Sequence, residues 1–218
     1  MTNSIRPRIN LKLRTRALCV LASLLCSCAA TSVKETWKAP DVHRPAGKIA
    51  VLAVDDRLLL RQGFENRLAG QLTKAGASAR VTYNDLSLAE IKQDKRAAGD
   101  RFRSSGAETI LIMRMVDAAS TYRVIQPGGE SYAAVITGID SADWYGYYSV
   151  GFMNMATSYG NLKQRVALET SLYDLKTEKR LWSALTQTVV KETMDRVGEM
   201  DPLVAKIIEA MRKDGVIP

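Results

Sequence analysis

Few residues of this chain could do covalent or acid–base chemistry, and the three cysteines come first among them. Cys19, Cys26 and Cys28 all fall within the first 28 of 218 residues. The single histidine, His43, lies in a short stretch flanked by prolines, which indicates an exposed linker residue rather than a base or a metal ligand. Cysteine or histidine chemistry is therefore expected only around Cys28.

The segment before Cys28 has the order of an export signal: a basic stretch, an apolar run from Ala17 to Leu25, and then small residues. The apolar run is too short for a permanent membrane helix, which needs about 20 apolar residues. We therefore expect residues 1–27 to be removed as a signal peptide. The basic residues are Arg6, Arg8, Lys12, Arg14 and Arg16.

The sequence Leu25-Cys26-Ser27-Cys28 resembles the lipobox of bacterial lipoproteins, with an aliphatic residue three places before the cysteine and a small residue just before it. The resemblance implies cleavage before Cys28 and acylation of that cysteine, for example with palmitate. The next residue, Ala29, is not an aspartate, and the sorting rules that the resemblance brings in then favour the outer membrane, on its periplasmic face. Ordinary cleavage near Ala29-Ala30 without a lipid is the alternative.

Cleavage before Cys28 leaves one acylated cysteine, so no intramolecular disulfide can form and the apolar core must hold the fold. The chain has 31 basic and 23 acidic residues, five of the basic ones in the signal, which leaves 26 against 23 in the mature chain. A nearly balanced charge without a basic stripe argues against a nucleic-acid partner.

The mature chain lacks the motifs of the common enzyme classes. It has no GxSxG, P-loop or dinucleotide fingerprint, so we expect no enzyme and no cofactor. Asp55 and Asp56 follow a predicted strand and could hold a cation, but two adjacent carboxylates are too few ligands, and a loop or helix-capping role is preferred. Chemistry that uses carboxylates alone, as in glycosidases, stays open as an alternative.

Hydrophobic periodicity predicts a tether over residues 28–47 and one α+β domain over residues 48–218, with a mixed sheet of about five to seven strands covered by three helices. The order is βαβαβ, then antiparallel hairpins and a C-terminal helix. The predicted helices follow Asp56, the capping box Ser87–Glu90 and the Asp201-Pro202 pair. The predicted strands are Lys48–Val54, Ala79–Tyr83, Glu108–Val116, the hairpin Thr121–Ile125 and Tyr132–Thr137, and a second hairpin, Val166–Tyr173 with a partner strand through Leu181-Trp182.

The stretch Trp144–Leu162 carries no charged residue, which is unusual in a chain with 25% charged residues. A surface loop that docks on a partner is preferred, since tyrosines give contact area at low entropy cost. A membrane-inserted β-hairpin and plain packing over the sheet are the alternatives. The candidate contact residues are Trp144, Tyr145, Tyr147, Tyr148, Phe152 and Tyr159.

In this order of elements the chain resembles a broad group of envelope lipoproteins, which includes the curli-secretion lipoprotein family and the lipoprotein activators of penicillin-binding proteins. The likeness rests on the lipobox and on Lys48–Val54, Ser105–Ile112 and Glu169–Ser183, where a hairpin with a Tyr-Asp turn precedes a Trp-Ser strand. Related families of unknown function share that hairpin, often after a Gly/Tyr-rich insert. The resemblance implies an anchored role in binding or assembly.

We therefore expect an outer-membrane lipoprotein, held in the periplasm by the lipid on Cys28, that binds or helps assemble another envelope component without catalysis. The partner would be an envelope protein or a glycan. The alternatives are a subunit of an oligomeric secretion pore that inserts residues 144–162 as a β-hairpin, and a carboxylate-dependent enzyme.

Overall fold

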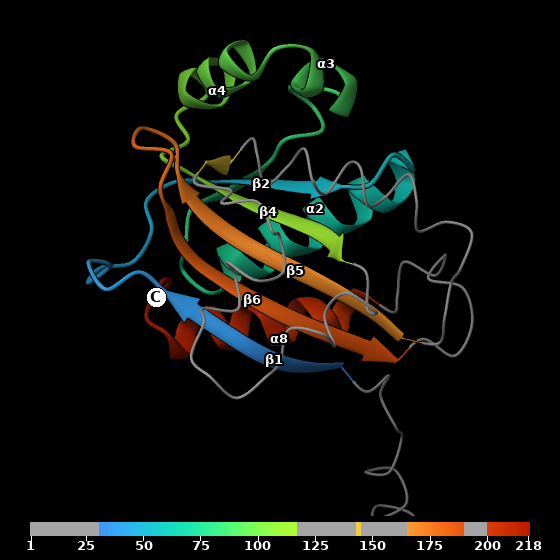
Figure 1. Ribbon diagram of the computed structural model, residues 1–218, viewed down its shortest axis with the longest axis vertical. Helices are drawn as coiled ribbons and strands as arrows, with labels where there is room; N and C mark the ends of the chain where they lie inside the picture. Colours follow the sequence, from blue (N-terminus) through green and yellow to red (C-terminus); the bar gives the residue numbers. More distant parts are fainter. Residues whose placement is uncertain (1–30, 117–142, 145–164, 190–199) are drawn as a thin grey trace, which may run out of the picture.

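The computed structural model describes residues 31–116, 143–144, 165–189 and 200–218. These residues form one six-stranded mixed sheet with strand order β1-β6-β5-β4-β2-β3, together with four helices (Figure 1). β2, β3 and β4 are parallel to one another, and the other pairings are antiparallel. The elements are β1 Thr31–Lys38, β2 Ile49–Val54, α2 Leu58–Lys74, β3 Ala79–Val81, α3 Leu88–Gln93, α4 Lys95–Ser104, β4 Thr109–Val116, β5 Arg165–Asp174, β6 Arg180–Val189 and α8 Met200–Lys213.

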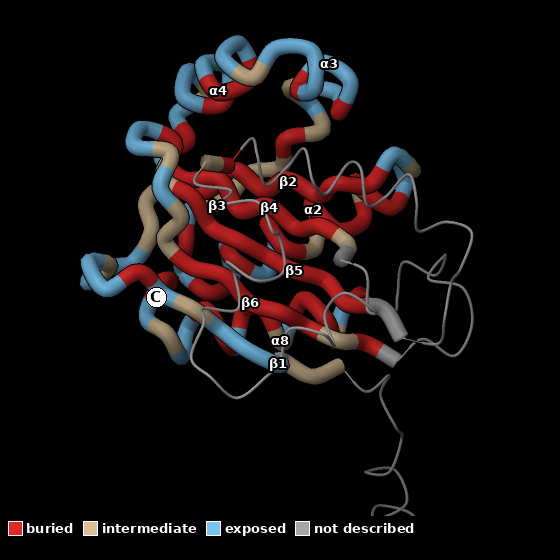
Figure 2. The backbone as a smooth tube through the Cα atoms, in the orientation of Figure 1, coloured by how far each residue is buried: buried red, intermediate tan, exposed pale blue. Residues whose placement is uncertain are grey.

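The sheet carries an apolar core on each face because alternate residues of its strands point to opposite sides. On one face, Ile49, Val51 and Ala53 of β2 pack with residues of α2 and α8. On the other face, Ala50 and Leu52 pack with residues of α3 and α4. All of β2 is buried, as Figure 2 shows for the centre of the sheet, so the continuous apolar run is a strand covered on both faces.

The predicted fold class is confirmed: the chain has an α+β fold with a mixed sheet covered by helices. The second predicted helix is divided, since Asp94 adopts an extended conformation, ends α3 and caps α4 by accepting a hydrogen bond from the backbone N–H of Ala97. The predicted capping box is present, with the Ser87 hydroxyl and the Glu90 carboxylate each bonded to the other's backbone N–H.

The expected tether is corrected over Thr31–Lys38, which form β1 and pair with β6 along its length, with one irregularity between Val33 and Glu35. The following loop is also held, because Ala46 donates a backbone hydrogen bond to Val216 at 2.8 Å. The segment looked unstructured because an outer strand of a sheet exposes one face and needs few large apolar side chains. His43 in the loop is exposed, as expected.

The predicted hairpin over residues 121–137 lies outside the described residues, whereas the second predicted hairpin is present as β5 and β6. The side chain of Asp174 builds its turn: Oδ1 accepts hydrogen bonds from the backbone N–H groups of Lys176 and Thr177 at 2.9 and 2.6 Å. Glu178 then takes a positive φ of 60°. This is the Asx-type turn chemistry that favours aspartate at such a position.

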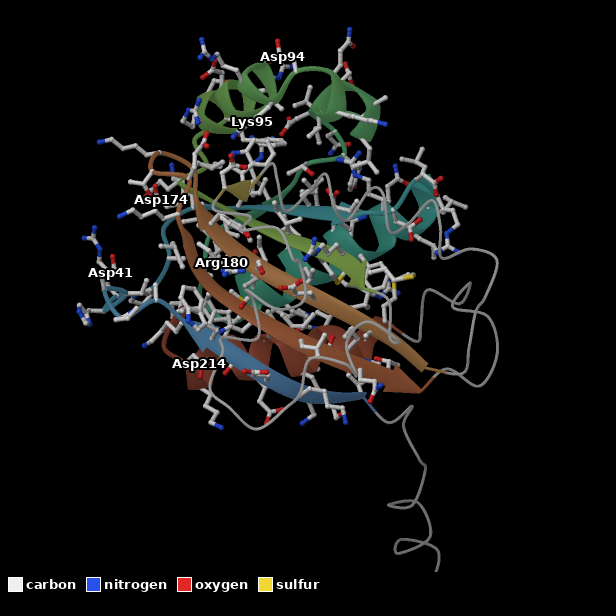
Figure 3. The ribbon with its side chains drawn as sticks, in the orientation of Figure 1. Asp41, Asp94, Lys95, Asp174, Arg180 and Asp214 are labelled. Carbon is white, nitrogen blue, oxygen red and sulfur yellow. The ribbon has the colours of Figure 1, made fainter. Side chains whose placement is uncertain are left out.

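The strand directions give the sheet two unlike ends. At one end, which we call the turn end, β1 and β5 stop and β2, β3, β4 and β6 start; it lies on the left in Figure 1, near the C-terminus. At the opposite end, which we call the exit end, β1 and β5 start and the other four strands stop. Figure 3 places Asp41, Asp174 and Asp214 at the turn end.

Candidate functional site

The described residues form several separate ranges. Where the first or last residue of such a range belongs to a strand, it lies at the exit end. Segments of the chain that lie outside the described residues join it at Thr31, Val116, Arg165 and Val189, and each of these residues begins or ends a strand at that end. α8 also starts there, because its last turn lies at the turn end, where Asp214 accepts a hydrogen bond from the indole of Trp182. The exit end is therefore the end nearest in sequence to the predicted lipid site, and the longer connections join the strands there.

Most of the predicted site residues lie outside the described part: Cys28, Tyr145, Tyr147, Tyr148, Phe152 and Tyr159. Trp144 is described, and it is fully buried, which corrects the expectation of a surface contact at this position. Its ring packs edge-on against Phe102 of α4 with centroids 6.0 Å apart. The large indole fills the core between α4 and the sheet, and its burial stabilises the fold rather than a complex.

The residue before Trp144 is held by an ion-pair cluster. Lys95, at the start of α4, contacts Asp143 at 2.6 Å and Glu178 of the β5–β6 turn at 3.0 Å. Partial burial alone would lower the pKa of Lys95, but the hydrogen bonds to the two carboxylates outweigh it and the net pKa is raised. The uncharged stretch therefore starts from a fixed point beside α4, and the chain reaches the exit end at Arg165.

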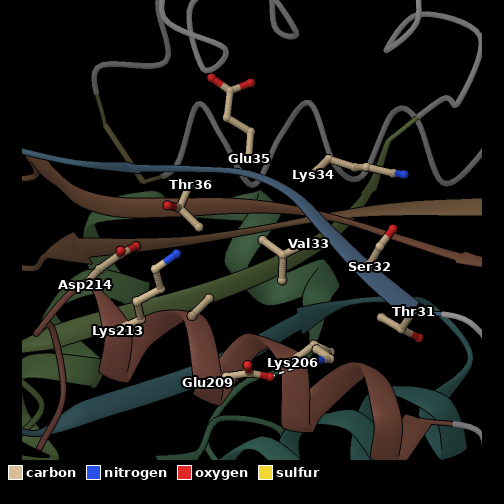
Figure 4. Close-up of a pocket in the computed structure, with 11 residues that line it drawn as sticks. Thr31, Ser32, Val33, Lys34, Glu35, Thr36, Lys206, Glu209, Lys213 and Asp214 are labelled. Atoms are coloured by element: carbon tan, nitrogen blue, oxygen red, sulfur yellow. Dashed lines mark hydrogen bonds and ion pairs between the residues drawn. The ribbon is translucent and has the colours of Figure 1, made fainter.

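A groove of about 500 Å³ runs between β1 and α8 (Figure 4). Lys206 and Glu209 of α8 pair at 2.6 Å within it, and this hydrogen bond lowers the pKa of Glu209. Glu35 points away from α8, and desolvation raises the pKa of its carboxyl group. The walls carry both signs of charge and no nucleophile with a base, so the groove suits binding of a polar segment better than catalysis.

A second groove, of about 570 Å³, lies at the exit end beside the carboxyl ends of β2 and β3. Open sheets with parallel strands commonly bind ligands at this position. Its walls include Asp55, Asp56, Leu58 and the loop before α3. Leu58 is 58% exposed and the adjacent Leu59 is 77% exposed, so this rim of the groove is apolar.

Asp55 has a structural role beside this groove. Oδ1 of Asp55 accepts a hydrogen bond from the backbone N–H of Arg57 at 2.9 Å, and its carboxylate pairs with the Arg57 guanidinium. This arrangement shapes the entry into α2, as the preferred loop role predicts. Among the described residues there is no group of three or more histidine, cysteine or acidic side chains that could hold a metal ion.

A buried ion pair that sequence reasoning missed fixes the loops of the same end. Arg61 and Glu65 of α2 pair at 2.7 Å, and Glu65 is fully buried. Glu65 also accepts hydrogen bonds from the backbone N–H groups of Ala53, Thr82 and Tyr83 at 3.3, 2.7 and 2.9 Å. A carboxylate with this many donors is well compensated, so the network joins α2, β2 and β3 as a structural element.

A second buried ion pair, also missed, lies between the adjacent strands β4 and β5. Arg114 reaches Oε2 of Glu169 through Nε and Nη2 at 3.1 and 2.7 Å, and both side chains are fully buried. Within the described structure Oε1 of Glu169 accepts no hydrogen bond. One signal was available: an arginine and a glutamate interrupt two apolar strands that the sequence predicts correctly. Opposite charges in register on neighbouring strands predict such a pair.

Comparison with known proteins identifies no family. No protein-family model and no curated protein matches the chain. Two solved structures of a PelC dodecamer from Paraburkholderia phytofirmans are 13% and 14% identical to it. They cover 84% of this chain each and 96% and 95% of their own, with TM-scores of 0.43 and 0.42. Likenesses this distant carry no argument about function. No helix among the described residues has the length and apolar character to cross a membrane.

Proposed function

We propose that the chain is an outer-membrane lipoprotein whose domain stands directly on the periplasmic face of the membrane and binds or helps assemble another envelope component without catalysis. The observation that carries the proposal is the position of β1. The export signal and the lipobox-like sequence point to acylation of Cys28, and β1 starts at Thr31 with only Ala29 and Ala30 between them. Three residues extend at most about 10 Å, so the lipid would hold the exit end close to the bilayer.

The uncharged stretch supports a binding role on that surface. It starts beside Trp144, which the core holds against Phe102, and rejoins the described chain at Arg165 on the exit end. Tyrosine side chains give a large contact area at a low cost in side-chain entropy. The contact residues that remain candidates are Tyr145, Tyr147, Tyr148, Phe152 and Tyr159, without the buried Trp144.

The test is the mass of the detergent-solubilised, full-length protein by native mass spectrometry, compared with a variant in which a Gly/Ser linker of equal length replaces residues 145–159. The replacement begins after Trp144 because loss of that side chain would damage the core. A second variant, with the tyrosines at 145, 147 and 148 changed to serine, keeps the segment and removes only its aromatic surface.

The proposal predicts an acylated chain that is a monomer or small oligomer in all three proteins. A large ring that collapses in the linker variant would replace it with the secretion-pore alternative. A chain without acyl groups would overturn the lipoprotein assignment itself. The enzyme alternative has no supporting observation among the described residues.

A further inference from the structure

α2 begins with two leucines whose apolar side chains are exposed to water. Leu58 and Leu59 are the exposed large hydrophobic side chains of the described structure, at 58% and 77% exposure, whereas the next residue, Leu60, is buried. Because successive residues of a helix point about 100° apart, Leu60 can face the core while the first two leucines face outward. Two adjacent exposed leucines form a small apolar projection at the exit end.

The start of α2 also lacks the features that stabilise a helix start in water. The residue at the N-cap is Arg57, whose side chain makes no capping hydrogen bond, and the first turn contains no acidic residue. Serine, threonine or aspartate at the cap and acidic residues in the first turn are the usual choices. The first backbone N–H groups of α2 therefore need water or lipid headgroup oxygens as acceptors, and only the two leucine side chains can leave water.

The projection and the predicted lipid site lie at the same end of the sheet. The paired registers place Glu35 of β1 in one row across the sheet with Val54 of β2. Thr31 lies four residues before Glu35 and Leu58 four residues after Val54, so both extend toward the exit end from the same row. Four strand spacings separate β1 from β2, about 19 Å.

The charged residues directly before the projection are Asp55, Asp56 and Arg57. Arg57 pairs with Asp55 at 2.9 Å, and Asp56 is exposed, so its carboxylate must stay at the level of the lipid headgroups. Paired charges cost less to bring to a bilayer surface than isolated carboxylates, and leucines gain by leaving water.

We infer that Leu58 and Leu59 insert into the membrane surface beside the lipid on Cys28 and form a second contact that fixes the orientation of the domain. The inference rests on the proposed lipoprotein function. One lipid anchor leaves the domain free to rotate about the attachment point, whereas a second apolar contact on a strand about 19 Å from β1 restrains that rotation. The domain would then stand with the exit end on the bilayer and the turn end toward the periplasm.

The experiment attaches an NBD fluorophore to the thiol of Leu59→Cys in the full-length protein, purified with its lipid and reconstituted into phosphatidylethanolamine–phosphatidylglycerol vesicles. After removal of the signal, the only other cysteine is Cys28, which acylation protects from labelling. The matched control is Lys74→Cys, which is exposed at the other end of the same helix, about 22 Å away. Intact mass first confirms acylation of each sample.

The inference predicts that doxyl-labelled lipids quench the probe at position 59 at least threefold more than the probe at position 74, whereas aqueous iodide quenches the second probe more. If acylation is confirmed and iodide reaches both probes equally, the inference is wrong while the lipoprotein function stands. Protection of position 59 from both quenchers would instead assign the leucines to a protein contact and also overturn it. Absence of acylation overturns the function and the inference together.

Discussion

The two ends of the sheet are built in different ways. At the turn end, Gly76, Gly106 and Gly215 adopt positive φ angles of 89°, 84° and 68°, and Glu178 adopts 60°, each in a short turn whose hydrogen bonds are local. At the exit end, chain segments outside the described residues join the sheet, two leucines are exposed, and the predicted lipid site lies three residues before β1.

We expect this difference to separate stability from the proposed function. Short turns with left-handed residues fix strand register. Long connections gathered at one end of a rigid sheet are the usual location of binding residues. We therefore expect changes at the turn end or in the core to alter folding, and changes at the exit end to alter membrane contact and partner binding.

The largest expected effect is that of Trp144→Ala. Removal of a fully buried indole from the core beside α4 should lower the free energy of unfolding by about 3 to 5 kcal/mol. Urea unfolding followed by circular dichroism measures it. Trp37→Ala is the control, since Trp37 is only half-buried beneath the Arg180 guanidinium and should cost clearly less. Equal costs would place Trp144 at the surface after all.

A smaller effect is expected at the turn end from Gly76→Ala. A Cβ there meets only ordinary contacts with Pro218, so the cost comes from the positive φ of 89° and should be about 1 to 2 kcal/mol. Gly70→Ala in the exposed middle of α2 meets nothing within 4 Å and should instead stabilise the protein by about 0.5 to 1 kcal/mol. The same sign for both variants in thermal unfolding would contradict this explanation of the turn.

At the exit end, the double change Leu58→Ser and Leu59→Ser should leave the free energy of unfolding within about 0.5 kcal/mol of the parent, because both side chains are exposed. Urea unfolding of the lipid-free domain measures it. A loss as large as that of Gly76→Ala would show that the leucines belong to the core and would remove the contrast between the two ends.

The smallest effect is a pH dependence at Glu35. Desolvation raises the pKa of this carboxyl group in the folded state, so its protonated form is favoured by folding. Its contribution is fully present below the unfolded pKa and is lost as pH rises through the folded pKa. Glu35→Gln should therefore be slightly more stable than the parent at pH 7 and equal to it near pH 3; a larger difference at pH 3 than at pH 7 would contradict this sign.

The sequence was sufficient for the elements whose signals are local. The capping box at Ser87 and the hairpin turn at Asp174 follow from residue types at fixed spacings, and both are present. β1 was missed because a strand at the side of a sheet is defined by its partner β6 rather than by its own apolar pattern. Trp144 was misplaced because the uncharged stretch alone does not show that α4 and the sheet enclose its first residue.

The two buried ion pairs also could not be predicted from local sequence patterns. Arg61 lies at a helical spacing from Glu65 that also fits a solvated surface pair, and only the positions of β2 and β3 make it buried. Arg114 and Glu169 are 55 residues apart in sequence and become neighbours through the register of β4 and β5. Long-range pairing of this kind requires the topology as well as the pattern.

The most direct test of the account is the intact mass of the mature chain extracted from bacterial membranes, with its N-terminal peptide sequenced by tandem mass spectrometry. We expect a chain that begins at Cys28 and is heavier than the polypeptide by the mass of its acyl groups. An unmodified chain that begins near Ala30 would contradict it, because nothing would then hold the exit end of the sheet at the membrane.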